Sequence, residues 1–340
     1  MPETTVGFLM LVVAGAMNAS FTLPMKFTRQ WAWENTWLAW TLFALFLFPP
    51  VLALLVVPHL GEVYRDAGPG PVLVVAAFGA GWGVAQVFFG LAVEAIGIAL
   101  TFSIVLGISA AVGSLLPFVR LHPEKLFTPV GCGIVAGVIL VIAGVAICAV
   151  AGRRREAMTT AGFGPAARSR SMKSGLMLSI ACGLGASFVN LGFSFGDSLL
   201  GSARKFGASP LGAPNAAWLP LMVAGGIPNL CYCLYLLSKN KTGSRFNGRT
   251  VGYWLLALLM AVFWFGSSQL YGISAGKLGG LGLIVGWPLF MSLIVIMASL
   301  LGVMTGEWKN SGRQPLRIQF AGVAMLVVAV FVLARASNGI

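Results

Sequence analysis

The sequence predicts an all-α membrane protein with ten transmembrane helices in two inverted five-helix repeats. Hydrophobic residues make up 58% of the 340 positions and charged residues only 9%. The apolar residues gather in ten segments of membrane-spanning length, and one polar stretch separates the first five from the last five. A soluble domain carries about 25% charged residues because its surface faces water. The solvent around most of this chain is therefore expected to be lipid.

Each apolar segment is about 20 residues long, the length with which a helix crosses roughly 30 Å of hydrocarbon. The first segment follows Met1-Pro2-Glu3 and lacks the basic leader and small-residue cleavage site of a secretory signal, so we expect it to remain as helix one. The expected spans are residues 6–25, 36–57, 71–93, 96–118, 129–151, 174–196, 214–238, 251–273, 279–304 and 316–335.

The polar stretch 152–173 is rich in Arg, Ser, Ala and Gly and reads as a cytoplasmic linker between a first repeat, 1–151, and a second, 174–340. Because five is odd, two related halves enter the membrane with opposite orientation. Short matches support the repeat. Asn18-Ala19-Ser20-Phe21 in helix one matches Gly185-Ala186-Ser187-Phe188 in helix six, and Gly83-Val84-Ala85-Gln86 in helix three matches Gly266-Ser267-Ser268-Gln269 in helix eight.

The distribution of positive charge predicts the orientation, because cytoplasmic loops collect Lys and Arg. Loops after odd-numbered helices hold fifteen of these residues, and the other side, including both termini, holds seven. We therefore expect both termini to be periplasmic, in a bacterial-type inner membrane. The net charge of +13 is divided among short clusters between apolar runs. Nucleic-acid binding, which needs a continuous basic surface, is not expected.

Catalytic and metal chemistry find little support in the sequence. His59 and His122 have no cysteine or carboxylate partners at metal-ligand spacing, and no catalytic triad is visible. We expect no enzymatic activity, no metal and no cofactor. The five cysteines lie inside apolar segments, where they read as small apolar filler: Cys132, Cys148, Cys182, Cys231 and Cys233.

Several motifs together resemble one transporter family. They are Leu23-Pro24-Met25-Lys26, residues 31–37, 78–83, 173–183 and 225–230, and, most specific of all, Glu307-Trp308-Lys309-Asn310-Ser311-Gly312-Arg313-Gln314-Pro315. Over nearly its whole length the chain resembles the L-rhamnose/proton symporter family of the drug/metabolite transporter superfamily. The resemblance implies ten helices, inverted repeats, a central cavity and proton-driven uptake of L-rhamnose or a related small sugar.

Amide side chains within the spans are the first candidates for binding a sugar. Hydrocarbon penalises an unpaired amide, so these side chains are expected to point into the helix bundle. Either they bind the substrate or they tie helices together, a contact worth about 1 kcal/mol or less. Gln86 and Gln269 favour binding because the repeat places them at equivalent positions. The five amides are Asn18, Gln86, Asn190, Asn229 and Gln269.

Aromatic residues inside the spans are the second group of candidates. Trp82, Trp264 and Trp287 either stack on a sugar or pack in the core, and Tyr271 offers both a ring and a hydroxyl. The tryptophans near span ends are interpreted as an interface belt: Trp31, Trp33, Trp37 and Trp308.

Proton coupling requires a group that gains and loses a proton as access alternates, usually a buried carboxylate. Glu34 at the start of helix two is the main candidate, with Lys26 across a short turn to neutralise it. The alternative is an acid placed there by the helix dipole. No acid lies at a span midplane, so facilitated diffusion, exchange or export of another small metabolite on the same scaffold stays open. The mechanism that we expect is alternating access around a central sugar site.

Overall fold

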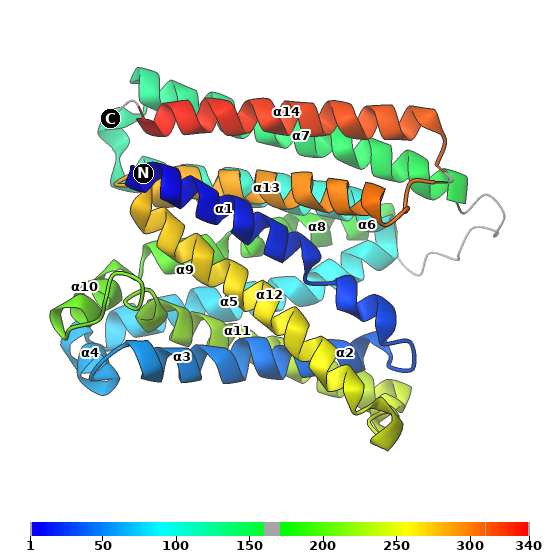
Figure 1. The fold of residues 1–340 in the computed structure, drawn as a ribbon, viewed down its shortest axis with the longest axis horizontal. Coiled ribbons are helices and arrows are strands. Elements are labelled where there is room, and N and C mark those ends of the chain that lie inside the picture. The colour runs from blue at the N-terminus through cyan, green and yellow to red at the C-terminus, as the bar shows by residue number, and fades with distance from the viewer. Residues whose placement is uncertain (1, 160–170, 310, 339–340) are drawn as a thin grey trace. The chain divides into compact units, whose positions relative to one another are not determined.

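The structure is a computed structural model that describes residues 2–159, 171–309 and 311–338, and within these ranges it is helical with no β-strand (Figure 1). Ten of its helical segments are long and apolar enough to cross a membrane, which confirms the predicted ten spans. The first half contains α1 (Glu3–Ser20), α2 (Trp33–Thr41), α3 (Phe48–Val56), α4 (Leu60–Ala67), α5 (Pro69–Ile96), α6 (Ile98–Leu121) and α7 (Pro129–Thr159). The second contains α8 (Met172–Ala186), α9 (Phe188–Ser194), α10 (Asp197–Lys205), α11 (Asn215–Asn240), α12 (Gly252–Lys277), α13 (Gly282–Met304) and α14 (Arg313–Asn338).

The expected linker 152–173 begins inside a helix. Helix α7 does not end at residue 151 but continues to Thr159, so Arg153, Arg154 and Arg155 lie on its final turns. Arg, Glu, Ala and Met are good helix formers, and the helix can therefore continue after the hydrocarbon ends. Residues 160–170 of the linker lie outside the described residues.

Spans one and six both break at the matching tetrapeptides. Helix α1 ends at Ser20 and a short 3-10 helix follows at Leu23–Phe27, whereas α8 ends at Ala186 and α9 begins at Phe188. The Ser187 hydroxyl donates to the Leu184 carbonyl at 2.6 Å, a local bond that competes with the helical ladder. The shared position of the two breaks supports the repeat, whose inverted orientation stays a prediction.

Span two is widened by prolines. Residues Leu42–Leu47 between α2 and α3 form a π-helical stretch, in which the Phe48 amide donates to the Phe43 carbonyl five residues back. Pro49 and Pro50 follow directly. A proline has no amide hydrogen and its ring collides with the carbonyl four residues before it, so the helix widens ahead of the pair.

The chain packs into two compact units. Unit 1 contains residues 1–19, 88–187 and 274–340, and unit 2 contains 20–87 and 188–273. The chain passes between them four times, after Ala19, Val87, Ser187 and Ile273, each time within a span. Two of these passages coincide with the breaks in spans one and six. Division by packing therefore differs from division by sequence, because each unit takes segments from both sides of the linker.

In unit 1, α7 and α14 lie side by side (Figure 1) and are antiparallel. Small residues bring their backbones close: a Cβ added at Gly144 would lie 2.8 Å from the Leu326 side chain, and one added at Gly322 would lie 2.5 Å from the Cys148 sulfur. Without a hydrophobic force between helices in lipid, such close contact is a main source of helix association.

In unit 2, α5 and α11 approach each other through glycines. A Cβ at Gly79 would collide with the Leu221 carbonyl oxygen, and a Cβ at Gly83 would collide with that of Gly225. These glycines therefore act in close helix packing. A Cβ at Gly225 would in turn lie 2.6 Å from the Trp82 ring, so Gly225 makes the space that the indole occupies.

We predict that Gly83→Ala lowers the thermal stability of the protein in detergent. The added methyl group meets backbone, which cannot move aside as a flexible side chain can, and overpacking of this kind costs about 1–3 kcal/mol. Gly90→Ala on the same helix is the matched control, because nothing lies within 4 Å of its added Cβ. Equal melting temperatures for the two variants would contradict the packing of α5 against α11.

Candidate functional site

Four tryptophans from three spans meet in unit 2, and we call Trp37, Trp40, Trp82 and Trp264 the tryptophan cluster. The rings of Trp82 (α5) and Trp264 (α12) are stacked, with centroids 5.5 Å apart and planes 17° apart. Trp40 (α2) meets the Trp264 ring edge-on at 5.1 Å, and Trp37 lies 4.6 Å from Trp40. The structure thus joins two of the three predicted inner tryptophans.

The sequence did not indicate Trp37 and Trp40 as members of an inner aromatic cluster. Trp37 was interpreted as part of an interface belt, but it is half-buried and its Nε1 donates to Asn229 Oδ1 at 3.3 Å. Trp31 likewise is buried, 5% exposed, against Phe246, Tyr253 and Trp254. The available signal was helical spacing, because residues 33, 37 and 40 lie on one face of α2.

The candidate amides Asn229 and Asn190 bond to other side chains of unit 2. Asn229 on α11 receives the Trp37 indole bond and donates through Nδ2 to the Gly225 carbonyl at 3.0 Å. Asn190 on α9 accepts the hydroxyl of Tyr271 on α12, and both side chains are fully or almost fully buried. These bonds tie helices of unit 2 together. A role of Asn190, Asn229 and Tyr271 in binding substrate remains a prediction.

The two glutamines differ from those amides. Gln269 Nε2 is buried and has no acceptor among the described residues. Gln86 is half-buried, and its side chain makes no hydrogen bond to the described part of the chain. An unpaired buried donor costs about 1–3 kcal/mol. A polar ligand that supplies an acceptor would remove this cost.

Helix α2 adds two more unpaired polar atoms at the tryptophan cluster. Trp40 Nε1 and Thr41 Oγ1 are both buried without a partner in the described structure. They directly precede the π-helical stretch, a feature that is frequent at functional sites. An indole N–H can only donate, and an amide nitrogen also donates. Unit 2 therefore contains at least two buried donors, Trp40 Nε1 and Gln269 Nε2, that have no acceptor among the described residues.

Asn18 and Trp287 belong to unit 1 and not to the unit that contains the tryptophan cluster. Trp287 Nε1 donates to the Ser109 carbonyl at 2.9 Å, and its ring lies against Gly113. This geometry favours the packing interpretation for Trp287. Asn18 on α1 is half-buried.

Glu34, on the first turn of α2, is 5% exposed. Its Oε1 accepts the Asn240 amide at 3.0 Å, from the last residue of α11, and the Thr242 hydroxyl at 2.7 Å, from the 3-10 turn that follows. The expected partner Lys26 is exposed on the 3-10 turn, and Glu34 is held by neutral donors instead. The sequence carried no signal for this, because the donors lie about two hundred positions away.

No group of three or more His, Cys, Asp or Glu side chains lies close enough to hold a metal ion within the described ranges. The buried polar groups of unit 2 described above are indole, amide and hydroxyl groups, with Glu34 as a buried carboxylate. Such groups bind an uncharged polar molecule by hydrogen bonds and aromatic contact.

Comparison with known proteins gives a match over almost the whole chain. The sequence profile of the L-rhamnose-proton symport protein family matches residues 2–337. Proteins named L-rhamnose-proton symporter are 26% identical over 325 residues in Mannheimia succiniciproducens (93% of each chain). Those of Cronobacter sakazakii are 27% identical over 335 residues (96% of this chain, 95% of the relative), and those of Klebsiella pneumoniae 26% over 333 residues (96% of each).

Two substitutions in α12 test which amide contacts are structural. We predict that Tyr271→Phe lowers thermal stability by about 1–3 kcal/mol, because it leaves the buried Asn190 oxygen without its donor. Gln269→Met removes a donor that has no partner and should leave stability unchanged or raise it. Melting curves in detergent without sugar measure both. A marked loss of stability in Gln269→Met would show that this amide is a structural tie.

Proposed function

We propose that the chain, which belongs to the L-rhamnose-proton symport protein family, takes up L-rhamnose or a related small sugar together with protons. The observation that carries the proposal is the family match, which extends through all ten spans. Relatives with that name align over 93–96% of this chain. The match is therefore to a whole carrier and not to one shared segment.

The substrate site that we propose lies in unit 2, at the tryptophan cluster with Gln86 and Gln269. The indole faces suit the C–H surface of a sugar ring, and sugar hydroxyl oxygens are acceptors for the unpaired Trp40 and Gln269 donors. Five further residues remain candidates: Asn18, Asn190, Asn229, Trp287 and Tyr271. The bonds described above for Asn190, Asn229, Trp287 and Tyr271 tie helices together or fix the packing.

The groups of the tryptophan cluster suit an uncharged polar substrate. The cluster's hydrogen bonds and ring contacts involve indole, amide and aromatic groups. This chemistry supports an uncharged polar substrate; a drug/metabolite-type exporter or a facilitator of another small polar metabolite on the same scaffold is the alternative.

Glu34 is the proton-coupling group that we propose. It is buried, and its two direct partners are a hydroxyl and an amide. When a carboxylate paired with a cation takes up a proton, the cation loses its partner. A carboxylate whose partners are neutral, as here, takes up a proton without that cost. Lys26, whose side chain is exposed, stays a prediction as the second coupling residue.

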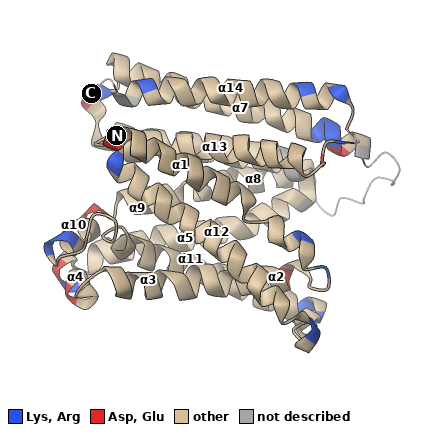
Figure 2. Cartoon of the chain, in the orientation of Figure 1, with Lys and Arg blue, Asp and Glu red and all other residues tan. Residues whose placement is uncertain are grey.

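The orientation proposed is periplasmic termini in a bacterial inner membrane. The charge count supports this orientation, and Figure 2 shows that Lys and Arg lie at helix ends and in loops. Alternating access is the mechanism proposed. The broken spans one and six support it, because helix breaks free backbone groups within the membrane for binding and movement.

Transport in proteoliposomes tests whether sugar uptake is coupled to protons. We predict that an imposed inward proton gradient drives accumulation of labelled L-rhamnose, and that a protonophore abolishes it. Equilibration without accumulation would exclude symport. Glu34→Gln, which keeps an acceptor for Thr242, should equilibrate the sugar but lose accumulation. Glu124→Gln, in an exposed loop, is the matched control and should behave as the wild type.

Ligand-dependent thermal stabilisation tests the site. We predict that Gln269→Ala and Trp40→Phe each weaken L-rhamnose binding by about tenfold, because each removes one hydrogen bond made only to substrate, worth about 1–1.5 kcal/mol. Trp254→Phe, a partly buried ring of unit 2 outside the tryptophan cluster, is the control. Its own melting temperature is expected to fall while its affinity stays the same. Wild-type affinity in both site variants would contradict the placement of the site.

A further inference from the structure

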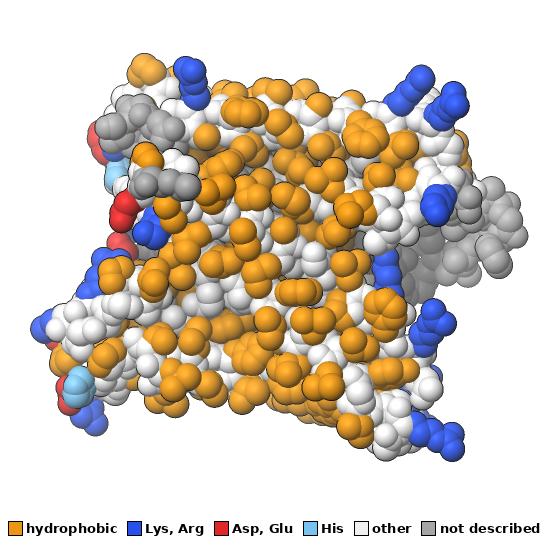
Figure 3. All heavy atoms as spheres, in the orientation of Figure 1, with side chains coloured by type: hydrophobic (Ala, Val, Ile, Leu, Met, Phe, Trp, Pro, Cys, Tyr) orange, Lys and Arg blue, Asp and Glu red, His pale blue; other side chains and the backbone are white. Residues whose placement is uncertain are grey.

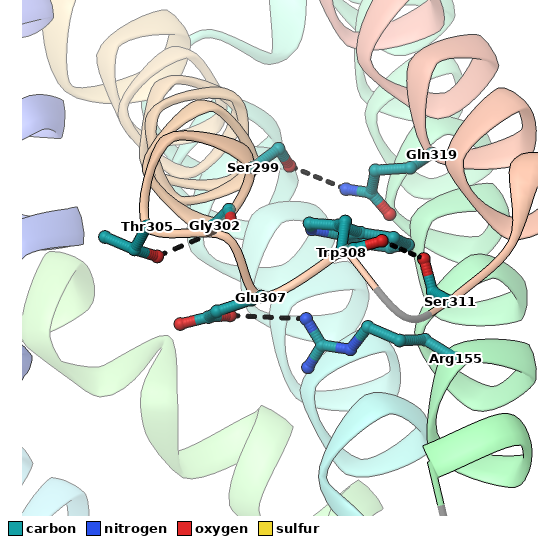
Figure 4. Close-up of polar contacts among 8 residues, drawn as sticks. All are labelled: Arg155, Ser299, Gly302, Thr305, Glu307, Trp308, Ser311 and Gln319. Atoms are coloured by element: carbon teal, nitrogen blue, oxygen red, sulfur yellow. Dashed lines mark hydrogen bonds and ion pairs between the residues drawn. The ribbon is translucent and has the colours of Figure 1, made fainter.

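Buried polar atoms without a partner are concentrated in unit 2. Six such side-chain atoms occur among the described residues, and five of them belong to unit 2. In unit 1, by contrast, polar side chains bond within the protein: Gln319 Nε2 donates to Ser299 Oγ at 2.6 Å, and Ser311 Oγ donates to the Trp308 carbonyl at 2.8 Å (Figure 4). An unpaired buried polar atom costs free energy, so unit 2 is the unit that gains most from a polar ligand.

Two of the five atoms lie apart from the tryptophan cluster, Trp218 Nε1 and Asn215 Oδ1. Both residues are on the first turn of α11, three positions apart, and are therefore neighbours on the helix surface. Their side chains are buried. Asn215 Nδ2 donates to the Gly212 carbonyl at 3.2 Å, which leaves the amide oxygen as the unpaired atom. An indole N–H only donates and an amide oxygen only accepts, whereas a hydroxyl group does both.

The Trp218 ring is held between α9 and α12. It stacks on Phe193 of α9, with ring centroids 4.5 Å apart and planes 20° apart. On the other helix, a Cβ added at Gly272 would lie 2.9 Å from Trp218 Nε1. Because Gly272 has no side chain, it leaves the nitrogen edge of the indole uncovered. Since Phe193 covers a ring face, the group that Trp218 can offer to a ligand is its N–H.

Two helices relate Trp218 to the tryptophan cluster. Gly225 of α11, which makes the space for the Trp82 ring, is seven residues after Trp218 and so lies on the same helix face. At 1.5 Å per residue, the two positions are about 10 Å apart along α11. On α12, Gly272 is eight residues after Trp264, or about 12 Å along that helix. Both helices thus place Trp218 one step along unit 2 from the stacked indoles.

Trp218 lies near one end of its span. The span begins at Asn215, and the Tyr64 hydroxyl on α4 donates to the adjacent Ala216 carbonyl at 3.1 Å. Because α4 follows span two, this end of unit 2 is the periplasmic end in the proposed orientation. Figure 3 shows hydrophobic side chains over the spans and charged side chains at their ends, so a polar sugar enters from an end and not from the lipid. A sugar from the periplasm meets Trp218 before the tryptophan cluster.

We propose that Trp218 and Asn215 form an outer binding position, which the sugar occupies before it reaches the tryptophan cluster. Sugar hydroxyl groups accept the Trp218 N–H and donate to Asn215 Oδ1. Gln269, three residues before Gly272 in the direction of the cluster, supplies the next unpaired donor. Access opens when α9, a seven-residue helix that follows the break at Ser187, moves away with Phe193. The inference rests on the proposed sugar uptake and orientation.

Trp218→Phe in the full protein tests the outer position. The variant keeps an aromatic ring against Phe193 and removes the N–H. We expect the initial rate of labelled L-rhamnose uptake into proteoliposomes to fall about tenfold, because one lost hydrogen bond lowers occupancy of this position by that factor. The equilibrium affinity at the tryptophan cluster, measured by thermal stabilisation in detergent, should stay at the wild-type value.

Trp31→Phe is the matched control, because Trp31 is also a buried indole of unit 2 but its Nε1 donates to the Arg245 carbonyl at 3.1 Å. Without sugar it should lower the melting temperature more than Trp218→Phe does, since a protein bond is lost with the ring. Its uptake rate per folded protein should equal that of the wild type. A larger loss of stability in Trp218→Phe than in Trp31→Phe would overturn the outer position, because it would show that the Trp218 N–H serves the protein.

Gly272→Ala is a second variant that keeps the indole and covers its nitrogen edge, so uptake should fall here too. Gly276→Ala on the same helix is its control, because nothing lies within 4 Å of the added Cβ. Wild-type uptake rates in both Trp218→Phe and Gly272→Ala would overturn the outer position and leave the proposed transport intact. Failure of the wild-type protein to take up L-rhamnose would overturn both proposals.

Discussion

Each polar group of the backbone must find its partner within the chain wherever hydrocarbon surrounds it, and this constraint governs the structure. It explains why the described residues form helices and why small residues carry the closest contacts. In lipid, apolar surface gives helices little reason to associate, so the approach of α5 to α11 depends on Gly79 and Gly83. The space left at Gly225 then holds Trp82, and through it the tryptophan cluster.

The number of spans followed from apolar length alone, because about 20 apolar residues have few other stable environments. The ends of the spans did not. Helix α7 continues to Thr159 because helix propensity persists after the bilayer ends, and no hydropathy signal marks that point. The break at Ser187 also escapes a hydropathy count, since α8 and α9 are both apolar. Only the repeated Ala-Ser-Phe hinted at it.

The candidate site, too, was predictable from the sequence only in part. That Trp82 and Trp264 lie in the interior was visible from their positions within spans, but their stacking depends on the crossing of α5, α11 and α12. The partners of Glu34 were beyond sequence reasoning, which looked to the neighbouring Lys26. Asn240 and Thr242 are distant along the chain and reach Glu34 only through packing. Contacts between distant segments are what a single sequence hides most completely.

The four passages of the chain between units have a consequence for how such a protein can arise and be divided. Neither half of the sequence contains a complete compact unit: residues before the linker supply α7 without α14, and α5 without α11. A polypeptide with one half alone would expose the glycine faces that its missing counterpart covers. If the halves descend from a duplicated ancestor, that ancestor was stable only as a pair of chains. Fusion through the linker then joined covalently two chains that already depended on each other for packing.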